Sequence, residues 1–338
     1  MARTAALLVT IAALVFPSTA SAQNTRPRIY KLEELRGPQV DALDRERTLF
    51  ILPVGMLEVH GPHLPIGNDT IGLLYEAGEV SRRVSRTLPQ WNVVMMPPIH
   101  YGQSGANDLG GLLVHPGTYA IRQSTLRSLV ADVGGQVAQN GFKWIFVLNG
   151  HGAPTHNIAI NEACDFISER YRVTMLHVTA LLRADADMQT AARKTDSRFF
   201  SDAARTSFGL DLHAGVSETS GALAIRPDLV DPQYKRLPSR AGQTLDEVRT
   251  IAGTPGWQGY LSDPAKGTAA HGRAVEDGWI NGFTTLILRA VRGENLFEHA
   301  RFPETVPPPI AGVTQKALDN EAAFGSALDA WLAERRAR

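Results

Sequence analysis

Cysteine is almost absent from this chain, because Cys164 is the only one among 338 residues. A single thiol cannot form an intramolecular disulfide, so a disulfide framework is excluded. Cys164 lies in a segment with helical spacing, where a lone cysteine is typically a small buried apolar side chain. A cysteine nucleophile is therefore not expected.

The chain also lacks an excess of charge of either sign, with 34 basic and 34 acidic residues. Proteins that bind nucleic acid concentrate positive charge on one face, and a neutral chain lacks that surplus. After the N-terminal segment, no apolar run approaches the roughly 20 residues that a membrane-spanning helix needs. We therefore expect no nucleic acid partner and no membrane span.

Two common hydrolase motifs are missing as well. The sequence has no His-Glu-x-x-His pattern, which excludes the zinc-binding helix of zincins. It has no Gly-x-Ser-x-Gly pattern, which argues against a serine nucleophile on a strand-to-helix turn. Any hydrolytic chemistry must depend on other residues.

The first 22 residues have the pattern of a secretory signal peptide. Arg3 supplies a positive start, an apolar run covers residues 5–16, and an Ala-x-Ala motif ends at Ala22. The alternative is an uncleaved anchor or tail, but the apolar run is too short for a spanning helix. We expect cleavage after Ala22 and export of residues 23–338 to the periplasm or the medium.

Short apolar, β-branched runs alternate with longer segments of helical spacing. The runs predicted to be buried strands are residues 48–54, 92–97, 143–149, 172–178 and 283–289. Helical spacing marks residues 71–84 and 126–137, and a last helix is predicted over 315–338. This alternation favours an α/β fold, a three-layer α/β/α sandwich around a mostly parallel sheet.

We expect one catalytic domain over residues 23–338, with its core at about residues 48–290. Residues 185–210 and 231–275 are richer in polar residues, Gly and Pro. We interpret these two segments as long connections that could cover a site, rather than as separate domains.

Polar side chains gather directly after two of the predicted strands. The loop after the first strand carries Glu58, His60 and Asp69, and the loop after residues 143–149 carries His151 between two glycines. In open α/β sheets, ligands bind outside the carboxyl ends of the strands. The two loops should therefore meet in one crevice.

The donor atoms in these loops are carboxylate oxygens and imidazole nitrogens, which suit Zn²⁺ or Mn²⁺ and exclude a soft thiolate site. Asp69 precedes a helical segment, so its alternative role is to cap that helix. Beside the other donors, however, a buried carboxylate needs a partner such as a metal ion. We predict Glu58, His60, Asp69 and His151 as metal ligands.

A third polar segment contains His213 and Glu218. These side chains could act as general base, general acid or further metal ligands. The alternative for His213 is a histidine that only satisfies hydrogen bonds within the fold. His63, in the first loop, is interpreted as orienting that loop rather than as a ligand.

The polar segments form three motifs with characteristic spacing. They are Glu58-Val59-His60-Gly61-Pro62-His63-Leu64-Pro65 with Asp69, then Asn149-Gly150-His151-Gly152, and then His213-Ala214-Gly215 with Glu218-Thr219-Ser220. In order and spacing these motifs resemble the creatininase (creatinine amidohydrolase) family. The resemblance runs from about residue 48 to residue 289.

The resemblance implies an amidohydrolase with a binuclear metal site. Glu58 and His151 would bind one cation, His60 would bind the other, and Asp69 would bridge the two. Zn²⁺ and Mn²⁺ are the expected cations, with iron as a third candidate. Such cations lower the pKa of bound water from ~15.7 towards ~7, which supplies a nucleophile near neutral pH.

The resemblance also implies roles for the third motif. His213 would carry a proton to the leaving nitrogen, and Glu218 would support the site or contribute a ligand. Creatininase has a glutamate for its second metal where this chain has Ala153. The second cation would therefore be weakly held, absent, or held by Glu218.

A second departure concerns the substrate. The stretch between Tyr101 and His115 is rearranged, with Gly110-Gly111 added, and it belongs to the pocket wall of the family. Creatinine is therefore not the expected substrate.

We predict an exported, metal-dependent amidohydrolase that cleaves a non-protein C–N bond in a small amide, cyclic amide or formamide. One alternative is a metal-dependent peptidase acting on small modified peptides. Another is a periplasmic small-molecule binding protein or pseudoenzyme, which the missing glutamate at Ala153 brings into consideration. The resemblance further implies a homo-oligomer.

Overall fold

A parallel five-stranded sheet forms the middle layer of the molecule. The computed structural model describes residues 28–337, so the predicted signal peptide lies outside the described residues. The sheet order is β1-β3-β2-β4-β5. The strands are β1 (Ile29–Lys31), β2 (Thr48–Val54), β3 (Asn92–Met95), β4 (Trp144–Asn149) and β5 (Thr174–His177).

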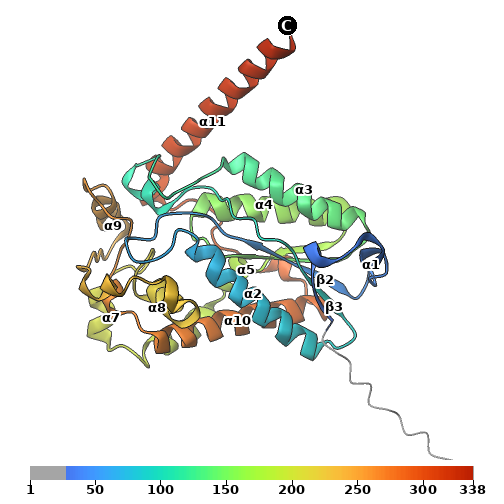
Figure 1. Cartoon of the computed structure of the whole chain (residues 1–338), viewed down its shortest axis with the longest axis horizontal. Coiled ribbons are helices and arrows are strands. Elements are labelled where there is room, and N and C mark those ends of the chain that lie inside the picture. The colour runs from blue at the N-terminus through green and yellow to red at the C-terminus, as the bar shows by residue number, and fades with distance from the viewer. Residues whose placement is uncertain (1–27, 338) are drawn as a thin grey trace, which may run out of the picture.

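Helices cover both faces of this sheet (Figure 1). α3 (Gln123–Gln139) and α4 (Pro154–Tyr171) pack on one face. α2 (Asn68–Thr87), α5 (Val178–Ala184) and α10 (Ala269–Val291) pack on the other. This arrangement confirms the predicted three-layer α/β/α sandwich.

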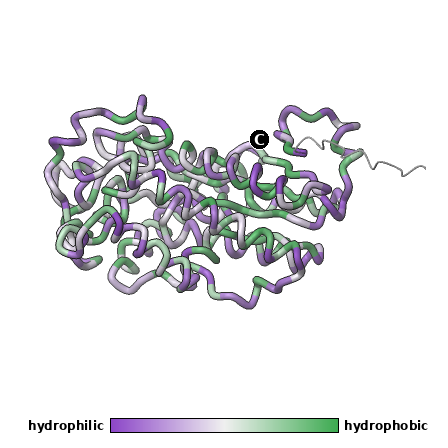
Figure 2. Tube along the Cα trace, turned by 90° about the horizontal axis from the view of Figure 1, so that it is seen from below, coloured by the Kyte–Doolittle hydropathy of each residue, from purple (hydrophilic) through white to green (hydrophobic). Residues whose placement is uncertain are grey.

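Strand β2 shows why the sheet needs both layers. Phe50 and Leu52 lie in the core formed with α3 and α4, whereas Leu49 and Ile51 lie in the core formed with α2 and α10. Side chains alternate between the faces of a strand, so a run that is apolar throughout must be buried on both sides. The hydropathy colouring in Figure 2 shows apolar segments running through the interior and polar ones around it.

Residues 283–289 form a helix and not the predicted strand, because they belong to α10. Phe283, Leu286, Ile287 and Ala290 are buried in this helix, with the three- and four-residue spacing of one helical face. The hydroxyl of Thr284 donates to the carbonyl of Ile280, so this β-branched residue is satisfied within the helix. The apolar run fits a buried helix as well as it fits a strand.

The two segments that were predicted to be long connections contain helices. The segment 185–210 contains α6 (Ala186–Asp196) and α7 (Asp202–Phe208), and the segment 231–275 contains α9 (Leu245–Ala252) and the start of α10. α1 (Gly37–Asp41) lies between β1 and β2 in the chain, and α8 (Val216–Ile225) carries Glu218. Among the described residues, no helix is both long enough and apolar enough to cross a membrane.

The last helix, α11 (Pro308–Arg336), begins before the predicted position 315. Pro308 and Pro309 occupy its first turn, where proline loses no hydrogen bond. Its first part packs on the body through Ile310 and Ala317, and its second part projects away from the body (Figure 1).

Candidate metal centre

The two predicted loops meet at the carboxyl ends of neighbouring strands. β2 and β4 pair in parallel, and their last paired residues are Val54 and Asn149. A Cβ atom at Gly150 would lie 2.5 Å from the carbonyl oxygen of Asp69, so only glycine allows this approach. The crevice predicted from strand order is therefore present.

Carboxylates and imidazoles converge in this crevice. Nδ1 of His151 lies 2.8 Å from Oε1 of Glu58 and 3.2 Å from Oδ2 of Asp69. Nε2 of His60 lies 3.0 Å from Oδ1 of Asp69 and 3.5 Å from Oε2 of Glu218. All except Glu218 are at most 6% exposed. Asp69 thus faces both histidines.

These side chains form two donor sets that share Asp69. Glu58, Asp69 and His151 form one set, and His60, Asp69 and Glu218 form the other. Within each set the candidate ligand atoms lie within 4.8 Å of one another. Three protein ligands and an open position are typical of catalytic metal sites.

Hydrogen bonds outside the donor sets fix the orientation of both histidines. Nδ1 of His60 donates to the carbonyl of Glu58 (3.1 Å), and Nε2 of His151 donates to the carbonyl of Ser104 (2.6 Å). The opposite ring nitrogens are then unprotonated in the neutral imidazoles and face the carboxylates. Oε2 of Glu58 also accepts from the backbone N–H of Ala106 (2.8 Å).

The donor atoms fit a divalent cation better than they fit one another. Nε2 of His60 and Oδ2 of Asp69 are buried, and in the described part of the chain neither makes a hydrogen bond of good geometry, although they lie 3.0 Å from Oδ1 of Asp69 and 3.2 Å from Nδ1 of His151, respectively. Buried polar groups without hydrogen bonds are costly unless another partner, such as a metal ion, satisfies them. Oxygen and nitrogen ligands of this kind suit Zn²⁺, Mn²⁺ or iron.

The charges of the crevice are strongly coupled. Burial alone would lower the pKa of His60, but the carboxylates of Asp69, Glu218 and Glu58 raise it to about 10. Burial also opposes the charged form of His151, yet Glu58 and Asp69 raise its pKa well above the usual value. The same contacts hold the pKa of Asp69 well below its usual range against the effect of burial.

These pKa shifts predict that the metal-free protein releases protons when it binds cations. At pH 7 the raised pKa values keep His60 and His151 protonated, so a cation must displace both protons. Displacement of the His60 proton should make apparent affinity fall by about tenfold per pH unit as pH falls below about 10, and displacement of the His151 proton should steepen this fall. Titration with Mn²⁺ in buffers of different ionisation enthalpy measures the released protons. His60→Gln should release one proton fewer, and affinity independent of pH between 6 and 9 would contradict the assignment.

His213 and Glu218 both lie at the crevice, as predicted. Nε2 of His213 donates to the carbonyl of Val59 (2.7 Å), and its Nδ1 lies 3.8 Å from Oε1 of Glu58. Oε2 of Glu218 accepts from the N–H of Ala214 (2.5 Å), and its side chain is 35% exposed. Glu58, His60 and His213 form a third set of donors within 4.8 Å.

Other residues of the motifs orient the loops. The N-cap position of α2 is Gly67, so Asp69 lies inside the first turn and is not the cap. Nε2 of His63 lies 2.9 Å from the hydroxyl of Thr219 and joins the first loop to α8, outside the metal donor sets. The side chain of Asn149 bonds both the N–H (2.9 Å) and the carbonyl (2.7 Å) of His151.

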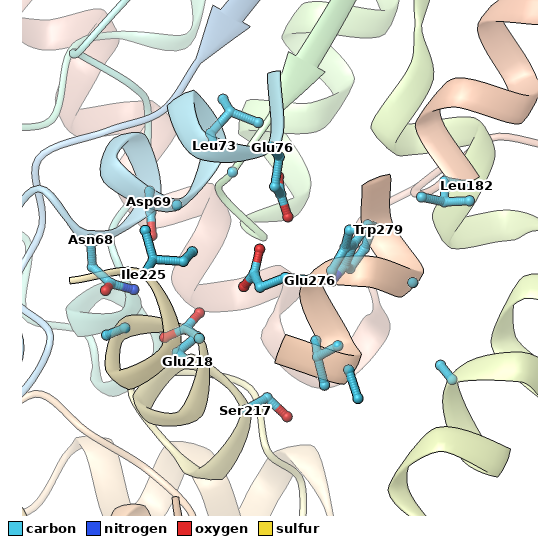
Figure 3. Close-up of a pocket in the computed structure, with 18 of the residues that line it drawn as sticks. Asn68, Asp69, Leu73, Glu76, Leu182, Ser217, Glu218, Ile225, Glu276 and Trp279 are labelled. Carbon is cyan, nitrogen blue, oxygen red and sulfur yellow. The ribbon is translucent and has the colours of Figure 1, made fainter. Parts of the chain in front are cut away.

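The donor sets open into a cavity of about 510 Å³. Asp69 and Glu218 line it together with Glu76, Arg183, Glu276 and Trp279, and residues of α6 form another part of its wall. Figure 3 shows the Glu76 and Glu276 carboxyl groups facing each other across this cavity. Arg183, Glu76 and Glu276 were not predicted from the sequence. The available signal was a charged residue within an otherwise apolar helical face.

Comparisons with known proteins agree with the motifs. Residues 33–287, which include all six predicted site residues, match the model of the creatininase family, described as creatinine amidohydrolase. The mycofactocin precursor peptide peptidase of Mycolicibacterium smegmatis is 28% identical over 245 residues, 71% of this chain and 85% of that protein. The creatinine amidohydrolase of Pseudomonas putida is 29% identical over 190 residues, 54% of this chain and 66% of that protein.

A solved structure of creatininase with manganese has the same fold. It matches with a TM-score of 0.56 and 24% identity, and the match covers 77% of this chain and 98% of that one. The family match spans most of the chain, and the matched range contains the three motifs gathered in the crevice. The chain belongs to the creatininase family.

Proposed function

We propose that this chain is a metal-dependent amidohydrolase that cleaves the C–N bond of a small amide, cyclic amide or formamide. The observation that carries the proposal is the pair of donor sets that share Asp69 and contribute Asp69 and Glu218 to the lining of a cavity. A cavity of about 510 Å³ suits a small molecule. The test is metal analysis of the purified protein, coupled to a screen of cyclic amides, formamides and short peptides. A protein without metal-dependent turnover on any of these would contradict the proposal.

Divalent cations held by the donor sets would polarise the amide carbonyl and acidify a water molecule near neutral pH. We infer that His213 moves the proton. Its Nε2–H is held by the carbonyl of Val59, so its Nδ1 is free to accept a proton from the attacking water. As the new C–O bond forms and the C–N bond breaks, Nδ1 returns this proton to the leaving nitrogen. Glu218 serves as a ligand beside His60. It takes the place of the glutamate that creatininase has at the position of Ala153.

A peptidase activity on small modified peptides is the second candidate. The relative that supports it is the mycofactocin precursor peptide peptidase, 28% identical to this chain. Peptides in the same screen distinguish it from an amidohydrolase of non-peptide substrates. A binding protein or pseudoenzyme would retain ligand affinity after metal removal, whereas the hydrolase should lose turnover.

Glu218→Gln should remove one of two cations. This change removes the carboxylate that belongs only to the set of His60, Asp69 and Glu218. The other set, Glu58, Asp69 and His151, remains intact. We expect metal content to fall from about two ions to about one per chain, because a neutral amide is a poor ligand for these cations. Mass spectrometric metal analysis after dialysis measures the change. The control variant Glu276→Gln alters a carboxyl group of the same cavity outside the donor sets and should keep both ions. If the Glu218→Gln protein also kept two ions, Glu218 could not be a metal ligand.

Two further properties are part of the proposal. Export follows from the signal-peptide pattern of the first 22 residues, and N-terminal sequencing of the protein from a periplasmic fraction would test it. Assembly with further copies of this chain is supported by α11, which exposes Phe324, Leu328 and Trp331 along its projecting part. Light scattering of the purified protein measures the number of copies.

A further inference from the structure

Arg183 is a cation of the cavity that forms no ion pair within the described residues 28–337. It lies on α5, directly after β5, and lines the same cavity as Asp69 and Glu218. Its Nε atom is buried and bonds to no residue that the structure describes. None of the ion pairs found among residues 28–337 includes its guanidinium group.

The guanidinium group lies beside the loop that carries His151. A Cβ atom at Gly152 would lie 3.6 Å from Nη1 of Arg183, which is an ordinary contact distance, so the guanidinium lies directly beside this glycine. The group also lies over the ring of Trp279 at 5.5 Å and near the ring of Phe302 at 5.9 Å. Aromatic faces hold a guanidinium without using its N–H donors. The donors thus remain available to a ligand near the candidate metal centre.

The nearby carboxyl groups would compensate this charge less when the cations are bound. Asp69 and Glu218 are the neighbours that would give their charge to the cations. Burial, followed by the facing Glu276, raises the pKa of Glu76 well above its usual value, and burial raises the pKa of Glu276 to about 7. The pair therefore holds a proton near neutral pH and carries less than two negative charges. Neither carboxyl group forms an ion pair with the guanidinium, so its N–H donors can bind an anion of the substrate.

We propose that Arg183 binds a carboxylate of the substrate, so that the substrate class is an amide carrying a carboxylate, such as an N-acyl amino acid. This inference rests on the proposed amidohydrolase function and specifies its substrate. The planar guanidinium matches a carboxylate through two parallel N–H···O bonds. Carboxylate binding at Arg183 orients the substrate while its amide group faces Asp69 and Glu218.

The first test uses probes that bind metal at one end. They are dicarboxylic acid monohydroxamates with two to five methylene groups, each compared with its methyl ester by calorimetry on the Mn²⁺-loaded protein. For at least one chain length of the probe, the acid should bind about 10- to 100-fold more tightly than its methyl ester. This is the affinity gain expected from a hydrogen-bonded pair of opposite charges. Arg183→Met should remove this advantage and leave the affinity for the ester unchanged.

Two variants control the interpretation. Arg226→Met removes another arginine of the same cavity, but one whose Nη2 is already paired with Oδ2 of Asp228 at 2.6 Å, so the advantage of the acid should persist. Arg183→Lys keeps the charge without the paired donors and should retain only part of the advantage. Equal binding of acid and ester at every length, or equal losses for both in Arg183→Met, would overturn the inference.

A second pair of probes separates this inference from the proposed function. N-acetylglycine and N-acetylglycinamide differ only in the carboxylate and contain no hydroxamate. If hydroxamate binding does not depend on metal, the proposed metal centre is wrong, and this second pair alone decides the role of Arg183. Preference for N-acetylglycine that Arg183→Met removes would support carboxylate binding, and no preference would reject it.

Discussion

Asp69→Asn is expected to abolish both metal loading and turnover while leaving the fold intact. Asp69 is the only side chain present in both adjoining donor sets, so its loss leaves each set with two protein ligands. An amide of the same size cannot supply the charge that a bridging carboxylate provides. We expect less than one ion per chain and a loss of turnover of about 10³-fold or more, because the water loses its acidifying cations.

Metal analysis and kinetics at saturating Mn²⁺ measure this result together, and circular dichroism checks that the variant is folded. Glu79→Gln makes the same carboxylate-to-amide change on the same helix, outside the donor sets, and should keep both metal and activity. If Asp69→Asn retained both ions and near-normal turnover, the two donor sets could not be the working site. The roles of the other ligands would then have to be reassigned.

The sequence predicts that the candidate site residues gather at one edge of the sheet, although it misassigns some elements of the fold. Glu58, His60 and His151 could be placed together because each follows a buried strand, and parallel strands end at the same edge of a sheet. The meeting of these loops can be predicted from strand order and short loop lengths alone. It does not depend on whether residues 283–289, which belong to α10, are assigned as helix or strand.

The error at residues 283–289 has a physical cause. A short apolar run with threonine and isoleucine satisfies both the burial of a strand and the burial of a helix face, so periodicity alone cannot separate them. The preceding residues 269–282, which extend the helix over further turns, decide between the two. β1 was missed for the opposite reason, since a strand of three residues is too short to show a period.

The lining of the cavity was beyond local sequence reasoning. Glu76 lies on the apolar face of α2, between the buried residues Leu73 and Val80, where a carboxylate is out of pattern. Arg183 similarly ends a run of buried residues in α5. Each is a visible irregularity, but its partner comes from a distant element, and only the fold shows that Glu76 faces Glu276 (Figure 3).

His213→Gln is expected to separate proton transfer from metal binding. Both ions should remain, because the two donor sets that share Asp69 do not include His213. Glutamine can still donate towards Val59 but cannot accept and return a proton, so turnover should fall by about 10²- to 10⁴-fold. The loss should be smaller for an activated anilide than for an alkyl amide, because a good leaving group needs less protonation. Comparison of kcat for the two substrates measures this dependence.

His63→Gln provides the matched control, since His63 is also a buried histidine of the crevice region but bonds to Thr219 and belongs to none of the donor sets. It should lose much less turnover and show no dependence on the leaving group. If His213→Gln instead lost a cation, the set formed by Glu58, His60 and His213 would be a working metal site. The proton would then have to move through another group. Because Oε2 of Glu218 lies 3.5 Å from Nε2 of His60 and its side chain reaches the cavity, Glu218 would be the candidate that remains.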